Sequence, residues 1–299
     1  MTLARLFLAI LILGQSGAAL ASGADRRTAD GEVQIRVRNE VLGPVNRRLF
    51  GQFLERASFG EPGPEAALVP GTNRLLPRVV ELMEEMRIPL IRFPGGRDVD
   101  YIDWRDMIDH VPGREGGRPA SRGPGGKPLT NRFGLEEYFE LRDRLGNETI
   151  LVVNFLDAVS RKLPLEEAAL NAAGLVAYAN APAGEQLPDG MPDWPAVRAR
   201  NGHFSPHHAD YIQIGNEYWW WPQERLVSSD GKAMAADQLA EWFLECLKAY
   251  IRAIRNVDPS VKIIVDGEMP MGAQRTVLAD PDIRREVEFI AHHHTSPVR

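Results

Sequence analysis

Residues 211–217 read YIQIGNE and join a short apolar run to a glycine, an amide and a carboxylate. The apolar run is long enough for a buried strand. Gly215 lets the backbone bend or approach a ligand closely. In a parallel barrel, polar residues at the C-terminal end of a strand lie at the mouth, where chemistry takes place. We therefore expect Asn216 and Glu217 at such a mouth.

Residues 219–221, which directly follow this pair, are all tryptophan. An Asn-Glu pair beside indole rings suits sugar chemistry. A carboxyl group can protonate a glycosidic oxygen, an amide can bond a ring hydroxyl, and indoles can stack on a sugar face. The alternative interpretation is that Glu217 caps the following helix.

The composition is that of an ordinary globular protein, with 299 residues, 44% apolar, 25% charged and a net charge of −6. This length allows one large domain or two small ones. No basic cluster is dense enough to indicate a nucleic-acid partner. Residues 114–127 are basic but rich in glycine and proline, which indicates a solvated loop or, alternatively, a contact for an acidic polysaccharide.

The first 21 residues have the pattern of a signal peptide. Arg5 precedes an apolar run over residues 6–13, and Ala19-Leu20-Ala21 fits the small-x-small cleavage rule. We expect cleavage after Ala21 and a secreted or periplasmic protein. No later stretch is apolar enough to predict a membrane span. The single cysteine, Cys246, is expected to be an inert core thiol.

Strand patterns alternate with helix patterns along the chain. An edge strand is expected at 33–37 within an N-terminal segment, 22–48. Further strands are expected at 49–55, 89–96, 149–155, 209–217, 261–265 and 287–292. Helices are expected at 73–86, 133–145, 165–179, 235–254 and 279–286. Apolar strands alternating with helices indicate an α/β fold with a parallel sheet covered on both faces.

Polar side chains recur at or near the ends of these strands: Glu55, Arg92, Asn154, Glu217, Glu268 and His293. A ring of polar groups at one mouth favours a TIM-type (β/α)8 barrel over an open sheet. No glycine-rich nucleotide fingerprint follows any strand, and no cofactor is implied.

Four stretches together carry a resemblance to a known family: residues 49–55 (LFGQFLE), 92–96 (RFPGG), 131–134 (NRFG) and 215–217 (GNE). Their order and spacing, with VDPSVK at 257–262, resemble glycoside hydrolase family 51, the α-L-arabinofuranosidases. The resemblance runs from about residue 33 to the last residue and covers the N-terminal part of such enzymes. It implies a retaining glycosidase built on a barrel, of which residues 49–299 supply about six β/α units.

The resemblance also implies roles for single residues. Glu217 matches the general acid/base, Asn216 the amide that bonds the 2-hydroxyl, and Glu55 a carboxylate that holds sugar hydroxyls. Trp104 matches an aromatic residue of the pocket, and His293 a histidine near the nucleophile. The other predicted substrate-binding residues are Arg97, Asn154 and Trp219.

Alternatives stay open for several of these residues. Glu55 could instead be a buried ion-pair partner of Arg92, and Trp104 could be plain core. The histidines at 292–294 could suggest a metal, but no acidic or cysteine partner stands at ligand spacing, so no metal site is predicted.

Two departures from the family pattern affect the expected function. Arg97 stands where the family has a small or amide residue, and its guanidinium would crowd a furanose or select a charged substrate. The nucleophile of the family ends a seventh strand, whereas this sequence stops at Arg299, just past the sixth. Glu268 is a poor substitute for it. We therefore expect the last strands to be missing, unpaired edges that favour a homo-oligomer, and almost no hydrolysis by these 299 residues.

The sequence thus predicts an enzyme that releases α-L-arabinofuranosyl residues from plant polysaccharides, with arabinose-containing oligo- or polysaccharides as partners. Two rivals remain: another barrel glycosidase of the endo-glucanase, xylanase or agarase type, and a non-catalytic carbohydrate-binding protein. A purely structural domain is a third interpretation.

Overall fold

A computed structural model describes residues 39–41, 43–56 and 63–293. Nearly all of them belong to one compact unit, Val45–Arg299, and Met1–Pro44 forms a separate unit. The predicted signal peptide, the edge strand at 33–37 and His294 lie outside the described residues. Within the described part of the chain, every helix is too short or too polar to cross a bilayer.

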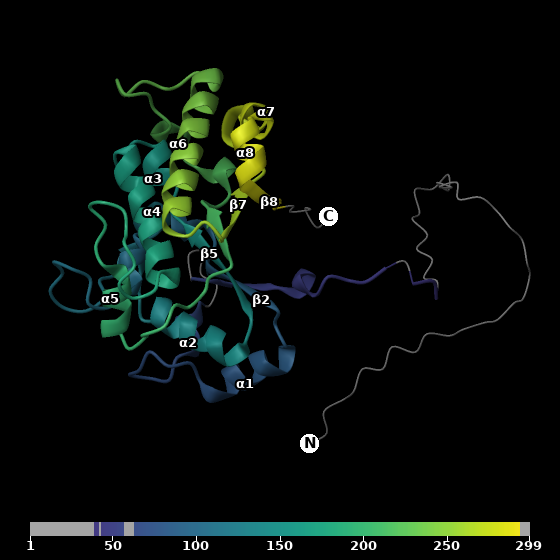
Figure 1. The fold of residues 1–299 in the computed structure, drawn as a ribbon, viewed down its shortest axis with the longest axis vertical. Helices are drawn as coiled ribbons and strands as arrows, with labels where there is room; N and C mark the ends of the chain where they lie inside the picture. The colour runs from purple at the N-terminus through teal and green to yellow at the C-terminus, as the bar shows by residue number, and fades with distance from the viewer. Residues whose placement is uncertain (1–38, 42, 57–62, 294–299) are drawn as a thin grey trace, which may run out of the picture. The chain divides into compact units, whose positions relative to one another are not determined.

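Six parallel strands form the main sheet (Figure 1). In chain order they are β1 (Gln52–Glu55), β2 (Leu90–Gly95), β5 (Glu148–Val153), β6 (Tyr211–Ile214), β7 (Lys262–Asp266) and β8 (Val287–Ala291). Each strand pairs in parallel with the one before it in this order. Parallel strands that neighbour one another in chain order form the wall of a β/α barrel. The predicted α/β fold with about six barrel units is confirmed.

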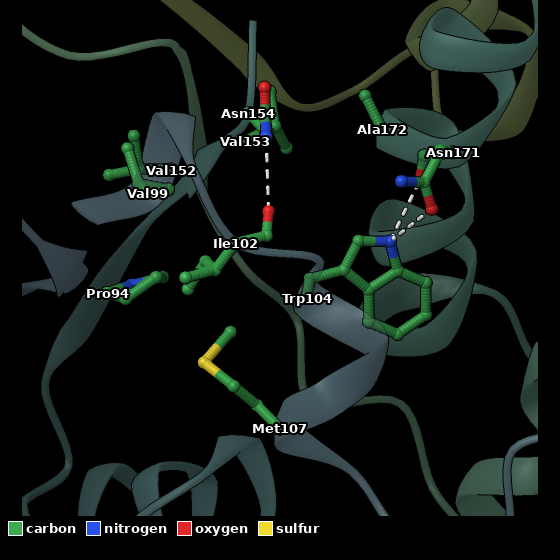
Figure 2. Close-up of a pocket in the computed structure, with 10 residues that line it drawn as sticks. All are labelled: Pro94, Val99, Ile102, Trp104, Met107, Val152, Val153, Asn154, Asn171 and Ala172. Atoms are coloured by element: carbon green, nitrogen blue, oxygen red, sulfur yellow. Dashed lines mark hydrogen bonds between the residues drawn. The ribbon is translucent and has the colours of Figure 1, made fainter. Parts of the chain in front are cut away.

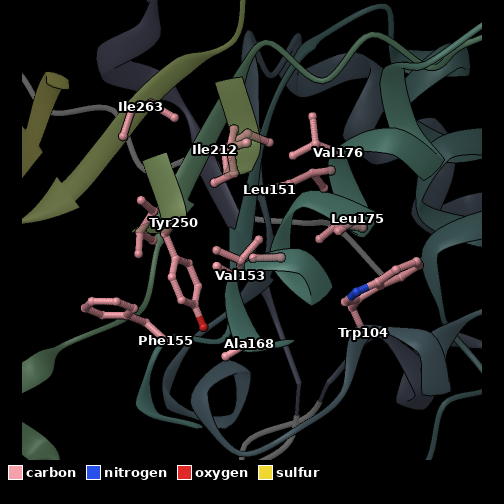
Figure 3. Packing of buried hydrophobic residues seen from close by; sticks show 14 of the residues in the cluster. Trp104, Leu151, Val153, Phe155, Ala168, Leu175, Val176, Ile212, Tyr250 and Ile263 are labelled. Carbon is pink, nitrogen blue, oxygen red and sulfur yellow. The ribbon is translucent and has the colours of Figure 1, made fainter. Parts of the chain in front are cut away.

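Helices connect the strands and cover the outer face of the sheet. They are α1 (Pro77–Met86), α2 (Leu135–Leu145), α3 (Leu156–Val159), α4 (Leu165–Asn180), α5 (Trp194–Arg200), α6 (Ala236–Val257), α7 (Gln274–Ala279) and α8 (Pro281–Glu286). The helices α4 and α6 lie side by side (Figure 1). Strand residues such as Leu151, Val153 and Ile212 pack with Leu175 and Tyr250 of these helices (Figure 3).

The long helix α6 forms because its apolar residues recur every three or four positions. Leu239, Phe243, Leu247, Tyr250 and Ile254 are all buried along one stripe. Full burial of such a side chain contributes about 1.5–3 kcal/mol to folding. This helix therefore supplies much of the outer core, and its one thiol is buried in the same stripe, as predicted.

The inner face of the sheet differs from the outer face. Alternate strand residues, including Leu90, Arg92, Ile150, Gln213 and Ile264, line a hollow of about 390 Å³. Two of these inward side chains are polar, and the hollow is open to solvent. The expectation of a sheet covered on both faces is therefore wrong for this face.

The predicted strand at 49–55 is also partly wrong. Residues Arg47–Phe50 form a 3₁₀ helix, and β1 begins only at Gln52. Leu49 is 77% exposed and Phe53 is 64% exposed. Among the described strands β1 has a single neighbour, β2, so its apolar side chains lack the second neighbour that would bury them.

Two long segments expected to be irregular contain short elements. Residues 109–130 include the antiparallel pair β3 (Ser121–Arg122) and β4 (Pro128–Leu129). Arg118 binds Asp109, Glu136 and Glu137, which ties this segment to α2. Residues 182–208 include α5, which begins after Asp193, whose side chain caps the helix.

Candidate active site

The chain turns sharply where β6 ends. Gly215 has a φ of 68°, and a Cβ atom there would lie 2.5 Å from Cε1 of Tyr218. Glu217 also lies in the left-handed region, with a φ of 44°. Such a conformation costs a non-glycine residue on the order of 1–3 kcal/mol and persists only where surrounding contacts enforce it. Those contacts come from two buried carboxylates.

The first of these carboxylates is Asp100, in a short 3₁₀ helix that follows β2. Its Oδ2 accepts hydrogen bonds from the backbone N–H of Asn216 at 3.0 Å and from Nε1 of Trp221 at 3.0 Å. Its Oδ1 accepts from the backbone N–H of Phe155 at 2.9 Å. Burial raises the pKa of Asp100 to about 6, against the opposing effect of these donors. Asp100 thus fastens the loops after β5 and β6 to each other.

The second carboxylate is Asp266, the last residue of β7. Its Oδ2 accepts the backbone N–H of Glu217 at 3.0 Å, and its Oδ1 accepts that of Glu268 at 3.1 Å. Burial raises the pKa of Asp266. Because it holds the backbone of Glu217, it fixes the direction in which that side chain leaves the strand.

The carboxyl group of Glu217 faces the imidazole of His293, just after β8. The distance from His293 Nδ1 to Glu217 Oε1 is 3.1 Å, and that from His293 Nε2 to Asp266 Oδ2 is 3.8 Å. The ring of Trp219 stands edge-on to this imidazole, with centroids 5.8 Å apart. The structure therefore brings three predicted site residues together, but His293 lies beside the predicted acid/base.

The side-chain amide of Asn216 is oriented by Arg92. Arg92 donates to Asn216 Oδ1 at 2.6 Å and to Gln213 Oε1 at 2.8 Å. Because a guanidinium only donates, it selects the oxygen of the amide and turns Nδ2 the other way. That Nδ2 is buried and has no hydrogen-bond partner among the described residues. The amide is therefore left with a hydrogen-bond donor for a ligand.

Glu55 is the last residue of β1, and its carboxyl lies against Gly96, directly after β2. A Cβ atom on Gly96 would lie 1.6 Å from Glu55 Oε1, so the close approach of this carboxyl requires glycine. Arg92 bonds the two amides through Nε and Nη2. Burial lowers the pKa of Arg92, and Asp266 and Glu55 act through space in the opposite direction.

Arg97 follows Gly96 and reaches across to the loop after β6. Its Nη2 donates to the carbonyl oxygen of Trp220 at 3.1 Å. Its guanidinium carbon lies 5.2 Å from the centroid of the Trp220 ring, and that tryptophan is 52% exposed. A cationic and aromatic unit thus stands next to the carboxyl groups.

Trp104 and Asn154 lie elsewhere, around a small inner cavity of about 10 Å³ (Figure 2). Trp104 donates to the side-chain oxygen of Asn171 at 2.9 Å and packs on Trp194. Asn154 donates to the carbonyl of Ile102 at 3.1 Å and accepts from a backbone N–H at 3.1 Å. Across the described residues, neither hydrogen-bonds with the Asn216–Glu217 pair. Both side chains are used within the fold, and their role in substrate binding stays a prediction.

Sequence reasoning missed Asp100 and Asp266, which hold the site in place. The signal for Asp266 was its position directly after a predicted strand and immediately before Gly267 and Glu268. The carboxyl of Glu268 faces His292, with Oε1 3.7 Å from Nδ1, which gives no support to Glu268 as a substitute nucleophile.

This geometry allows three interactions with a sugar: proton transfer, a hydrogen bond and ring contact. The carboxyl of Glu217 can give and take a proton next to an imidazole. The amide of Asn216 can donate to a hydroxyl, and Trp219 and Trp220 can contact a sugar ring.

Comparison with known proteins also indicates an enzyme family that acts on sugars. Residues 82–296 match the family model described as the alpha-L-arabinofuranosidase 1 domain. An intracellular exo-alpha-(1->5)-L-arabinofuranosidase of Streptomyces lividans is 28% identical over 85% of this chain and 34% of its own length. An exo-alpha-(1->6)-L-arabinofuranosidase of Bifidobacterium longum is 29% identical over 76% of this chain and 38% of its own length.

Solved structures show the same fold. The GH51 alpha-L-arabinofuranosidase of Thermotoga petrophila RKU-1 superposes with a TM-score of 0.60 at 23% identity, over 85% of this chain and 47% of that chain. A family 51 alpha-L-arabinofuranosidase of Bifidobacterium longum gives 0.61 at 21% identity, over 87% of this chain and 46% of that chain. The chain thus spans about half the length of these structures, and 34% to 40% of the curated relatives.

The predicted location is wrong by the same comparison. The relatives from Streptomyces lividans and Halalkalibacterium halodurans are named intracellular enzymes, which contradicts a secreted or periplasmic protein. The residues on which that prediction rested lie outside the described part of the chain.

Proposed function

The chain belongs to the family of the alpha-L-arabinofuranosidase 1 domain, and from this membership we propose that the protein is a retaining glycosidase that releases α-L-arabinofuranosyl residues. The observation that carries the proposal is the pairing of Glu217 with His293 at 3.1 Å, at the end of a barrel strand. Plant polysaccharide side chains are the proposed source of the sugar.

Glu217 is the proposed general acid/base. It gives its proton to the glycosidic oxygen as the bond to the departing sugar breaks, and later takes a proton from the water that releases arabinose. One contact supports this role: Asp266 accepts the backbone N–H of Glu217 at 3.0 Å, which holds the carboxyl in place for proton transfer.

Asn216 is proposed to bond the 2-hydroxyl of the bound furanose. Its Nδ2 has no partner in the part of the chain that the structure describes, and the hydrogen bond from Arg92 to Oδ1 opposes rotation of the amide. Hydrogen bonds to this hydroxyl strengthen in the transition state of glycosidases. Glu55 is proposed to hold the remaining hydroxyls from the neighbouring strand β1.

A retaining reaction needs a second carboxylate about 5 Å from the acid. Among the described residues, Asp266 is occupied by two backbone N–H groups and Glu268 faces His292. We therefore place the nucleophile outside the described residues.

The test is hydrolysis by the full-length gene product of nitrophenyl α-L-arabinofuranoside, nitrophenyl β-xyloside, β-glucan and agarose, with the anomeric configuration of released sugar followed by NMR. The proposal expects turnover of the arabinofuranoside with retention. Turnover confined to xyloside, glucan or agarose would replace it with another barrel glycosidase. Arabino-oligosaccharide binding without turnover would make the protein a binding module.

A further inference from the structure

One of the guanidinium groups at the rim of the site belongs to Arg97. Arg97 rests on Trp220 and donates one hydrogen bond to its backbone carbonyl. Within the described part of the chain it makes no salt bridge, whereas Arg56 is paired with Asp98 and Arg105 with Asp103.

The position of Arg97 makes this charge available to a ligand. Its backbone adjoins Gly96, against which the carboxyl of Glu55 lies, and its tip contacts the loop three residues beyond Glu217. The side chain therefore spans from the end of β2 to the end of β6, which are separated in the sheet by β5. It passes along the edge of the proposed reaction site.

We propose that Arg97 and Trp220 bind the carboxylate and ring face of a uronic acid, in the sugar that departs when the arabinofuranosyl bond breaks. This inference rests on the proposed function of Glu217 and names the substrate class: arabinofuranosyl groups carried by an acidic sugar.

The chemistry of the two side chains fits that ligand. A guanidinium binds a carboxylate through two parallel hydrogen bonds, a geometry that a lysine does not reproduce. An exposed indole offers an apolar surface to a sugar ring. The arabinofuranosyl group is neutral, so the carboxylate must belong to the sugar on the other side of the scissile oxygen.

The surrounding charges restrict where an acidic sugar can bind. Glu55 and Asp266 repel a carboxylate, and the guanidinium of Arg92 already bonds Gln213 and Asn216. Of these two arginines, Arg97 is thus the one with donors to spare. An acidic sugar in any other orientation would place its charge against the carboxyl groups.

The experiment compares matched substrates in the full-length gene product. We measure kcat/KM for arabinofuranosyl-glucuronate and arabinofuranosyl-glucose, and for the galacturonate and galactose pair. Binding of the same four compounds is followed by tryptophan fluorescence. We expect a preference of about 10-fold to 100-fold for the acidic member of at least one pair, as a charged hydrogen-bonded contact provides, and the pair showing it identifies the uronic acid.

The variants are Arg97→Gln, Arg97→Lys and a control, Arg161→Gln. Arg161 lies 3.5 Å from the ring centroid of Trp242 in α6 and donates to a backbone carbonyl, so it matches Arg97 in its contacts. Arg97→Gln should lose the acidic preference with little change for neutral substrates, Arg97→Lys should keep part of it, and the control should keep all of it.

Equal kcat/KM and equal binding for acidic and neutral members in the unmodified protein would overturn the inference, whatever the variants do. An acidic preference that survives Arg97→Gln would overturn it as well. A third outcome is selective binding of uronates that depends on Arg97, without turnover of any arabinofuranoside. This result would contradict the proposed function and leave Arg97 as a uronate-binding residue.

Discussion

The two sides of the mouth are built differently. On one side, Asp266 accepts the backbone N–H of Glu217 at 3.0 Å and that of Glu268 at 3.1 Å, and Nε2 of His293 lies 3.8 Å from its Oδ2. On the other side, Arg97 and Trp220 rest on each other near the surface, joined by one hydrogen bond at 3.1 Å. The first side is fastened to buried strand ends, and the second is supported by a loop.

This difference separates the residues proposed for proton transfer from those proposed for substrate recognition. Proton transfer requires atoms held within hydrogen-bond distance of the reacting oxygen, which buried contacts achieve. Recognition of a departing sugar tolerates a looser support, because a long side chain can adjust to its ligand. Substitutions on the fastened side should therefore lower kcat, and those on the loop side should change substrate preference.

The largest effect is expected for Glu217→Gln, on the fastened side. Loss of the acid should lower kcat on an arabino-oligosaccharide by about 100-fold to 10,000-fold, while binding is kept because the amide has the same shape. Steady-state kinetics with Glu268→Gln as the charge-matched control measures this. An equal loss in the control would remove the distinction between the two carboxyl groups.

A smaller effect is expected for Asp266→Asn. Asp266 accepts the backbone N–H groups of Glu217 and Glu268 through its two carboxylate oxygens, whereas an amide has only one acceptor oxygen. Glu217 would then be held less firmly, and kcat should fall about 10-fold to 100-fold. Steady-state kinetics on an arabino-oligosaccharide measures this, and an unchanged kcat in Asp266→Asn would contradict the account of how this side works.

The same substitution should alter stability against pH. The pKa of Asp266 is raised in the folded state, so the folded protein binds this proton more tightly than the unfolded chain does. The free energy of unfolding should therefore fall as pH rises from about 4 through the folded pKa. Asp266→Asn should reduce that slope in urea unfolding and leave the part that comes from Asp100, whereas an unaltered slope would assign all of it to other groups.

An intermediate loss of about 10-fold in kcat is expected for Arg92→Met, since the amide of Asn216 would be free to turn over. Crystals of this variant with bound arabinose would show the amide in two orientations. A single unchanged orientation would mean that Arg92 does not set it.

The smallest effect is expected on the loop side. Trp220→Ala should raise KM about threefold to tenfold with little change in kcat, since it removes ring contact remote from the proton transfer. A large fall in kcat would mean that the loop side also takes part in the chemistry.

Much of the architecture was predictable because apolar periodicity determines which elements form. The strands at β2, β5, β6, β7 and β8 and the helix α6 follow directly from it. The prediction of a strand at 49–55 was partly wrong, because apolar residues in a sequence do not reveal whether a strand has neighbours on both sides. Leu49 and Phe53 are apolar and exposed.

The site was only partly predictable for a similar reason. Glu217 and His293 could be placed from their positions after strands, but Trp104 and Asn154 face an inner cavity, a direction that sequence position does not give. Asp100 was missed because its partners, Asn216 and Trp221, are more than 100 residues away in sequence. Such contacts depend on the folded geometry of two loops.

The most direct measurement of the central claim is the dependence of Glu217→Gln on the leaving group. The full-length variant is assayed on arabinofuranosides whose departing alcohols range from dinitrophenol to a sugar. If Glu217 supplies the proton, the loss relative to the unmodified protein should be small for dinitrophenol, which needs no protonation, and should grow to about 1,000-fold for the sugar. A loss of the same size for every leaving group would contradict Glu217 as the proton donor.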